Sequence, residues 1–220
     1  MNKLNWMLLA ATSILLATLS AHAQQYQAGK HYTLIEPAVN TQAEQGQIEV
    51  VEVFSYACPH CYRFQPHIDQ WLSEKPDYVT FRRVAAQFNP TYEVFARAFV
   101  TADMMGLVDQ AHEPMFAALH DERRKFRSMQ DVAGFYAEYG ADKGRFLSTA
   151  ESFAVVTRMN KEAKDTRDYG IRGTPSLVVA GKYLISANND VPSHSDLIKV
   201  MQYLVEQEHS SVQPAVAGAE

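Results

Sequence analysis

The chain has 220 residues, of which 47% are hydrophobic and 20% are charged, a composition typical of a folded globular protein and not of a disordered one. Lys and Arg number 20 against 25 Asp and Glu, so the formal net charge is −5, and no nucleic-acid partner is expected. With only 2 cysteines, the chain also does not have the composition of a small scaffold held together by disulfides.

The N-terminus has the pattern of a secretory signal peptide. Lys3 precedes an apolar run over 6–19, and the Ala-His-Ala sequence at 21–23 matches a small-x-small cleavage site. The run is shorter than the roughly 20 residues that cross a bilayer, and an uncleaved membrane anchor is the alternative. We expect residues 1–23 to be removed and the mature protein, starting at Gln24, to be soluble and exported to an oxidising compartment.

The first strong elements are a strand and a helix with a cysteine between them. Ile48–Phe54 is rich in β-branched residues and predicts a strand. Pro59 suits the first position of a helix, which continues to about Glu74, because its missing N–H would have no partner there. Cys58 is then the N-terminal cap, where free backbone N–H groups and the helix dipole favour a thiolate. His60 adds a donor, and a positive charge when protonated.

Both cysteines, Cys58 and Cys61, belong to one Cys-Pro-His-Cys motif. On the chain-entropy model a disulfide across so short a loop stabilises the fold by only about 2 kcal/mol, against nearly 5 for a loop of about 100 residues. Zinc normally takes four ligands, often from two separated pairs, and the remaining histidines are scattered along the chain. A redox role is therefore favoured over a structural disulfide or a metal site, and no metal is expected.

The rest of the chain predicts one more strand, several helices, a hairpin and a final helix. In chain order we expect a strand over Val79–Ala85, helices over Pro90–Met105, Asp109–His120 and Ser128 to near Gly140, a short helix from Asp142, a long helix over Ser152–Tyr169, a hairpin of Leu177–Ala180 and Lys182–Ser186, and a helix over Ser193–Glu208. Ser128-x-x-Asp131 resembles a capping box. The mixture of strands and helices indicates an α/β fold.

Two motifs resemble the thioredoxin superfamily: the cysteine pair at a helix start, and the Gly-Thr-Pro sequence at 173–175 before a strand. In that superfamily the late proline is cis and faces the reactive cysteines. A long helical stretch separates the two motifs here. This long insertion, the signal peptide, and the sequences over 52–62 and 172–176 all resemble those of the DsbA family of bacterial periplasmic disulfide oxidases.

The resemblance implies a thioredoxin fold with a large helical insertion between the second strand and the cis-proline strand. The corresponding division of the chain is a signal peptide over 1–23, a thioredoxin-like domain over 24–88 and 170–209, an inserted helical domain over 89–169, and a flexible tail over 210–220. The tail is expected because that segment has no apolar periodicity.

The resemblance also assigns roles near the late proline. Cys58 is expected to be the exposed nucleophile and Cys61 its buried partner. Pro175 is expected to be the cis-proline, and the backbone of Thr174 to pair with a bound peptide as an added strand.

A buried acid is expected beneath the cysteine pair. Glu52 matches that acid by position and is expected to accept or relay the proton of Cys61, with Arg83 as its accompanying cation. The remaining carboxylate of the same strand, Glu49, is expected to be exposed. Pro59 and His60, which lie between the two cysteines, are expected to tune the redox reactivity of the cysteine pair.

The activity implied is donation of the Cys58–Cys61 disulfide to newly exported proteins in the periplasm. No cofactor is implied, the regenerating partner is a quinone-linked membrane protein of the DsbB type, and the protein is expected to be a monomer. Two alternatives stay open. One is a disulfide isomerase or reductase of the same fold, because Thr174 stands where the best-known family members have Val. The other is a non-enzymatic metal or peptide carrier.

Overall fold

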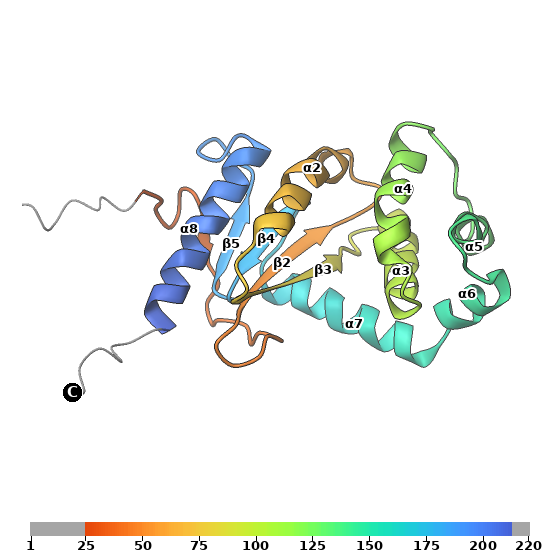
Figure 1. The fold of residues 1–220 in the computed structure, drawn as a ribbon, viewed down its shortest axis with the longest axis horizontal. Coiled ribbons are helices and arrows are strands. Elements are labelled where there is room, and N and C mark those ends of the chain that lie inside the picture. Colours follow the sequence, from red (N-terminus) through yellow and green to blue (C-terminus); the bar gives the residue numbers. More distant parts are fainter. Residues whose placement is uncertain (1–24, 213–220) are drawn as a thin grey trace, which may run out of the picture.

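A computed structural model describes residues 25–212, so the expected signal peptide over 1–23 lies outside the described residues (Figure 1). A five-stranded sheet has the order β1-β5-β4-β2-β3, with helices on its faces and a group of helices at one end. The strands are β1 (Thr33–Leu34), β2 (Ile48–Phe54), β3 (Val79–Ala85), β4 (Ser176–Val179) and β5 (Tyr183–Ser186). The helices are α2 (Pro59–Glu74), α3 (Pro90–Met104), α4 (Val108–His120), α5 (Met129–Glu138), α6 (Lys143–Ala150), α7 (Phe153–Asp168) and α8 (His194–Val212).

Strand β2 is the centre of the sheet. It runs parallel to β3, in a register that places Glu52 opposite Arg83, and antiparallel to β4. All seven of its residues are buried, which explains why its apolar side chains lie on both faces and do not alternate with polar ones. Successive side chains still point to opposite faces: Val50 packs in one apolar cluster, and Val51 in another.

Helices α2 and α8 cover one face of the sheet, as Figure 1 shows for the gold and blue helices. Ile68 and Trp71 of α2 and Leu197 of α8 are buried in one cluster with Val50. The end of α7 covers the other face, where Tyr169 packs in the cluster of Val51. The sheet is therefore enclosed between two layers, and α2 is fixed with its N-terminus beyond the end of β2.

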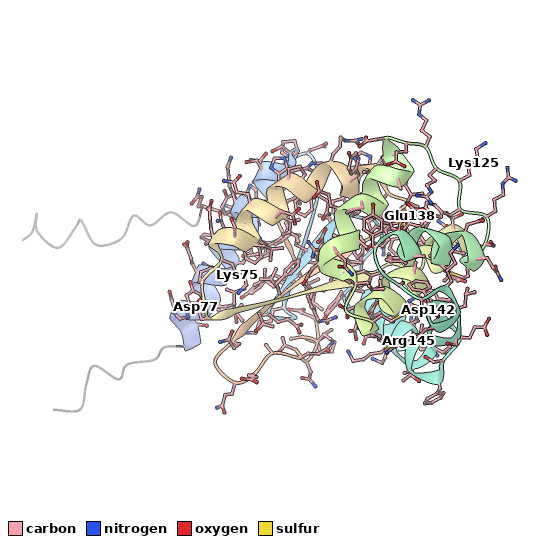
Figure 2. All side chains as sticks on the ribbon, turned by 45° about the vertical axis from the view of Figure 1, so that its right-hand side comes forward. Lys75, Asp77, Lys125, Glu138, Asp142 and Arg145 are labelled. Carbon is pink, nitrogen blue, oxygen red and sulfur yellow. The ribbon has the colours of Figure 1, made fainter. Side chains whose placement is uncertain are left out.

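Helices α3 to α7 lie between β3 and β4 in the chain, and α3 to α6 form a separate group beside the sheet. Figure 2 marks the outer part of this group with Glu138, Asp142 and Arg145, on the opposite side of the molecule from Lys75 and Asp77. The group has an aromatic core of its own, in which Phe95, Phe99, Phe116, Phe135, Tyr136 and Phe146 are buried. The α/β fold with an inserted helical region is as expected.

Local signals placed most element boundaries correctly. Ser128 and Asp131 form the predicted capping box at the start of α5, and Asp142 caps α6. The hairpin between β4 and β5 turns through Ala180 and Gly181, both at positive φ. A Cβ at Gly181 would lie 2.0 Å from the Val39 carbonyl oxygen, so only glycine fits there.

One strand was not predicted, and one helix end differs from the prediction by more than two residues. Strand β1 was not predicted, because a pair over two residues has no periodicity to detect; it is held by β5. Helix α8 continues to Val212, so residues 210–212 are helical and not part of a tail. Its last turns are anchored by Glu208, which is buried and accepts from Lys182 and from the hydroxyl of Tyr183. The rest of the predicted tail lies outside the described residues.

Candidate active site

Cys58 caps the N-terminus of α2. Its backbone is extended, with φ −92° and ψ 113°, and its Sγ accepts a hydrogen bond from the backbone N–H of Cys61 at 3.4 Å. Pro59 takes the first helical position, where no N–H is needed. The cap satisfies one of the free donors of the first turn and places a sulfur at the positive end of the helix dipole.

The two thiols differ strongly in acidity. Both cysteines are free, and the pKa of Cys58 falls to about 5, chiefly because the Cys61 thiol donates a hydrogen bond to it. Burial opposes this shift, while Thr174 and the backbone N–H groups of Cys61 and His60 support it. Burial raises the pKa of Cys61, and the neighbouring Cys58 thiolate raises it further. At neutral pH the pair therefore holds one thiolate, at Cys58, and one thiol, at Cys61.

Cys58 is less accessible than expected. Only 4% of the residue is exposed, while Cys61 is fully buried, so the expectation of an exposed Cys58 is wrong in degree although the order is right. The physical reason is the segment that faces the cap. The Sγ of Cys58 lies 3.3 Å from the carbonyl oxygen of Thr174, and both cysteines pack in the aromatic core of the helical group.

The peptide bond between Thr174 and Pro175 is cis, as the resemblance implied. Both residues line a cavity of about 660 Å³, which also reaches His60 on the first turn of α2. His60, Arg172, Leu184 and His194 are among the residues that line this cavity, together with Thr174 and Pro175. The Sγ of Cys58 contacts the Thr174 carbonyl, so the sulfur adjoins a residue that lines this groove, which has mixed polar and apolar walls and room for a short peptide segment.

Glu52 lies beneath the cap, fully buried, with Arg83 as its ion-pair partner. Arg83 Nε donates to Glu52 Oε2 at 2.9 Å, as expected for the cation beside the acid. Burial raises the pKa of Glu52, and the Arg83 guanidinium limits that rise. A buried carboxyl with a raised pKa takes up a proton more readily than an exposed one, which suits it to proton exchange.

Glu49 is a correction to the sequence prediction. It is 1% exposed and not an exposed strand carboxylate. Its Oε1 accepts from the backbone N–H of Gln42 at 2.9 Å and from Nε of Arg82 at 3.1 Å. Glu49 points to the face of the sheet that α7 covers, and this explains its burial: Arg82 also binds Asp165 of α7 at 3.3 Å.

His60 is exposed on the first turn of α2. Its Nδ1 accepts from Nη2 of Arg63 at 3.1 Å, and the residue lines the groove. The structure therefore brings together Cys58, Cys61, Pro59, His60, Thr174 and Pro175, with Glu52 buried below them. Within residues 25–212, no three His, Cys, Asp or Glu side chains are grouped so as to hold a metal ion.

Three further residues at the site were not found from the sequence. Gln65, one turn after Cys61 on α2, donates to Glu52 Oε1 at 3.4 Å and to the Cys61 carbonyl at 3.3 Å. His112 of α4 lies 3.1 Å from Gln65, and Tyr92 of α3 packs against the core around the cysteines. The i, i+4 spacing from Cys61 was a signal for Gln65. No local signal marks His112 or Tyr92, because their positions depend on how the helical group packs.

Comparisons with known proteins agree with this site. The profile of the DSBA-like thioredoxin domain matches residues 49–199. A Pseudomonas aeruginosa protein named thiol:disulfide interchange protein DsbA is 37% identical over 193 residues, which cover 88% of this chain and 90% of that protein. An Azotobacter vinelandii protein of the same name is 38% identical over 169 residues, covering 77% and 78% of the two chains.

Solved structures give the same answer. The crystal structure of Pseudomonas aeruginosa DsbA superimposes with a TM-score of 0.81 at 37% identity, covering 87% of this chain and 98% of that one. The structure of the oxidoreductase DsbA from Xylella fastidiosa gives a TM-score of 0.80 at 30% identity, covering 84% and 98%. The chain therefore belongs to the DsbA family, with its DSBA-like thioredoxin domain, and it is a thiol:disulfide oxidoreductase.

Proposed function

We propose that the protein donates its Cys58–Cys61 disulfide to reduced exported proteins and so catalyses disulfide bond formation. The observation that supports this most directly is the unequal acidity of the two thiols. A Cys58 thiolate with a pKa of about 5 stabilises the reduced pair, so the disulfide form is the less stable one and oxidises other thiols. A low pKa also makes Cys58 a good leaving group.

The reaction has two exchange steps. A substrate thiolate attacks Sγ of Cys58, the bond between Cys58 and Cys61 breaks, and its electron pair passes to Cys61, which takes up a proton. A second substrate thiolate then attacks the substrate sulfur of the mixed disulfide and releases Cys58 as a thiolate. The substrate loses two electrons and the cysteine pair gains them.

The surrounding residues support these steps. Glu52 exchanges the proton with Cys61, because its raised pKa is suited to that task. Pro59 and His60 shape the first turn of α2. In the free protein the Thr174 carbonyl contacts Cys58, and in the complex the backbone beside Pro175 pairs with the substrate as an added strand.

Export and regeneration complete the proposal. The sequence pattern over 1–23 directs the protein to the periplasm, where residues 24–88 and 170–209 act as the thioredoxin-like domain and 89–169 as the inserted domain. A quinone-linked membrane protein of the DsbB type reoxidises the pair, and the protein works as a monomer. None of the described helices is both long and apolar enough to cross a membrane.

The equilibrium redox potential of the Cys58–Cys61 pair against glutathione tests the direction of the reaction. We expect a value near the roughly −120 mV of DsbA proteins, not near the −270 mV or so of thioredoxin. A value close to that of thioredoxin would favour the alternative of a reductase or isomerase. That alternative rests on Thr174, which precedes the cis-proline where the best-known family members have Val. Failure to oxidise a reduced protein substrate would contradict the proposal directly.

A further inference from the structure

A chain of buried hydrogen bonds leads from the helical group to the acid beneath the cysteines. The hydroxyl of Tyr56 lies 2.8 Å from Nδ1 of His112, and Nε2 of His112 lies 3.1 Å from Oε1 of Gln65. The amide nitrogen of Gln65 then donates to Glu52 Oε1 and to the Cys61 carbonyl. His112 is only 7% exposed, and the other four residues are buried more completely.

The chemistry of the partners fixes the direction of every bond. Gln65 turns its amide nitrogen to two acceptors, so its Oε1 faces His112 and can only accept. His112 therefore carries its proton on Nε2, and its Nδ1 accepts from the Tyr56 hydroxyl. Burial keeps the ring neutral, because it lowers the pKa of His112 well below its ordinary value. Every group in the chain is satisfied in this one arrangement.

The ring of His112 is also held in place by packing. It meets Phe54, Phe99 and Phe116 edge-on, at centroid distances of 5.2, 6.1 and 5.3 Å. Charged or titratable groups around the chain come from several elements. They are Glu52 of β2, Arg83 of β3, Cys61 and Asp69 of α2, Asp103 of α3 and Tyr136 of α5. Of these, Glu52 accepts from the Gln65 amide through its side chain, and Cys61 accepts through its backbone carbonyl.

We propose that His112 is a positioning residue for the redox reaction: it fixes the Gln65 amide against Glu52, so that the buried acid is set for proton exchange with Cys61. The inference rests on the proposed role of the Cys58–Cys61 pair. The Gln65 donor stabilises the charged carboxylate. Without the His112 donor the Gln65 amide is free to rotate, and the carboxylate loses that support.

The step to measure is the one that removes the proton from Cys61. In a mixed disulfide of Cys58 with glutathione, the Cys61 thiolate attacks Sγ of Cys58, glutathione leaves as a thiolate, and the Cys61 proton passes to the Glu52 carboxylate. The mixed disulfide is formed at low pH, and glutathione release is followed after a pH jump. In His112→Phe we expect the midpoint of the rate against pH to move up by about one unit, which is about a tenfold lower rate below the midpoint.

Further variants separate positioning from a structural effect. Gln65→Met should move the midpoint by a similar amount, and His112→Phe should add nothing in the Gln65→Met background. His112→Gln, which keeps a donor for Gln65, should restore part of the rate. Phe135→Leu weakens the same aromatic core without touching the chain and should leave the midpoint unchanged.

The inference is overturned if His112→Phe leaves the midpoint in place, if Phe135→Leu moves it equally, or if the two substitutions at 112 and 65 are additive. If His112→Phe does not fold, Gln65→Met and His112→Gln decide the question. The redox potential of the unaltered protein tests the proposed function separately. The inference about His112 depends only on how the pH midpoint of glutathione release differs between variants. Each can therefore fail without the other.

Discussion

The sheet and the inserted helices bury their interiors in different ways. The sheet is apolar on both faces, yet its central strand carries two buried carboxylates, Glu49 and Glu52, each held by an arginine of β3. The helical group has an aromatic core that a chain of hydrogen bonds enters through His112. Helix α2 lies at the boundary: its cysteines pack in the helical core, whereas Ile68 packs on the sheet.

This difference shows how the two regions share the reaction. The sheet and α2 fix the Cys58 sulfur at a helix N-terminus and place the buried carboxyl of Glu52 below it. The helical group encloses both cysteines in apolar surroundings, and that burial raises the pKa of Cys61. Neither region alone produces one thiolate beside one thiol.

The largest effect is expected at the reacting sulfurs. Cys58→Ser should abolish oxidation of a reduced protein, because the helix cap then holds no nucleophile. Cys61→Ser should instead accumulate mixed disulfides with substrates, because Cys58 still bonds to a substrate cysteine but no Cys61 thiol is present to break that bond. Non-reducing electrophoresis of the trapped species measures both. Equal trapping by the two variants would contradict the assignment of Cys58 as the nucleophile.

The outer part of the helical core should matter for stability and not for the sulfur chemistry. Phe146 is fully buried and stacks on Tyr136 at a centroid distance of 4.7 Å. Phe146→Ala should lower the free energy of unfolding by about 3 to 5 kcal/mol, through lost burial and a cavity. Denaturant titration measures the loss, with Phe146→Leu as a milder control. The redox potential should stay unchanged, and a clear shift would mean that α6 is coupled to the cysteines.

Stability should depend on redox state and on pH. Relative to an ordinary thiol pKa of 9.0, the value of about 5 for Cys58 is depressed, so its contribution is full above pH 9 or so and is lost as the pH falls through 5. At pH 7 the two units between 7 and 5 correspond to about 3 kcal/mol of stabilisation of the reduced form. The disulfide stabilises the oxidised form by about 2 kcal/mol, because it lowers the entropy of the unfolded chain.

The reduced protein should therefore be slightly more stable than the oxidised one at pH 7, and the order should reverse as the pH falls towards 5. Parallel denaturant melts of both forms at pH 5, 7 and 8 would locate the crossing. An oxidised form that is more stable throughout this range would indicate a structural or reductase-type disulfide.

The smallest effect is expected at His60. Its ring is exposed and its Nδ1 accepts from Arg63, while its backbone N–H already supports the low pKa of Cys58 and is kept in an alanine variant. His60→Ala should raise the pKa of Cys58 by about half a unit to one unit and make the protein a weaker oxidant. Titration of the thiolate absorbance measures this. No change within about half a unit would show that His60 acts only as a groove residue.

Sequence patterns predicted the local structure around the site well. The cap at Cys58, the proline at the first helical position and the capping box at Ser128 depend on residues within one turn of each other, and all three are observed. The cis-proline and the pair of Glu52 with Arg83 came from the family resemblance, since the residues involved are far apart in the chain.

The residues that sequence reasoning missed depend on packing between distant segments. Glu49 looked exposed because a strand buried on both faces gives no alternation from which burial can be deduced. His112 is separated from Gln65 by 47 positions, and only the docking of α4 against α2 brings them together. The two-residue strand β1 exists because β5 offers it a free edge.

The paired charges of β2 and β3 also have a consequence for how the chain reaches its fold. Glu52 stands opposite Arg83, and Glu49 shares its face of the sheet with Arg82. Adjacent residues of a strand point to opposite faces, so Arg82 and Arg83 supply one cation to each buried carboxylate. Strands β4 and β5 carry no arginine or lysine, so pairing β2 with one of them in place of β3 would bury a carboxylate without a cation, at a cost of several kcal/mol. The two ion pairs thus favour β3 as the parallel neighbour of β2 during folding, before any cysteine reacts.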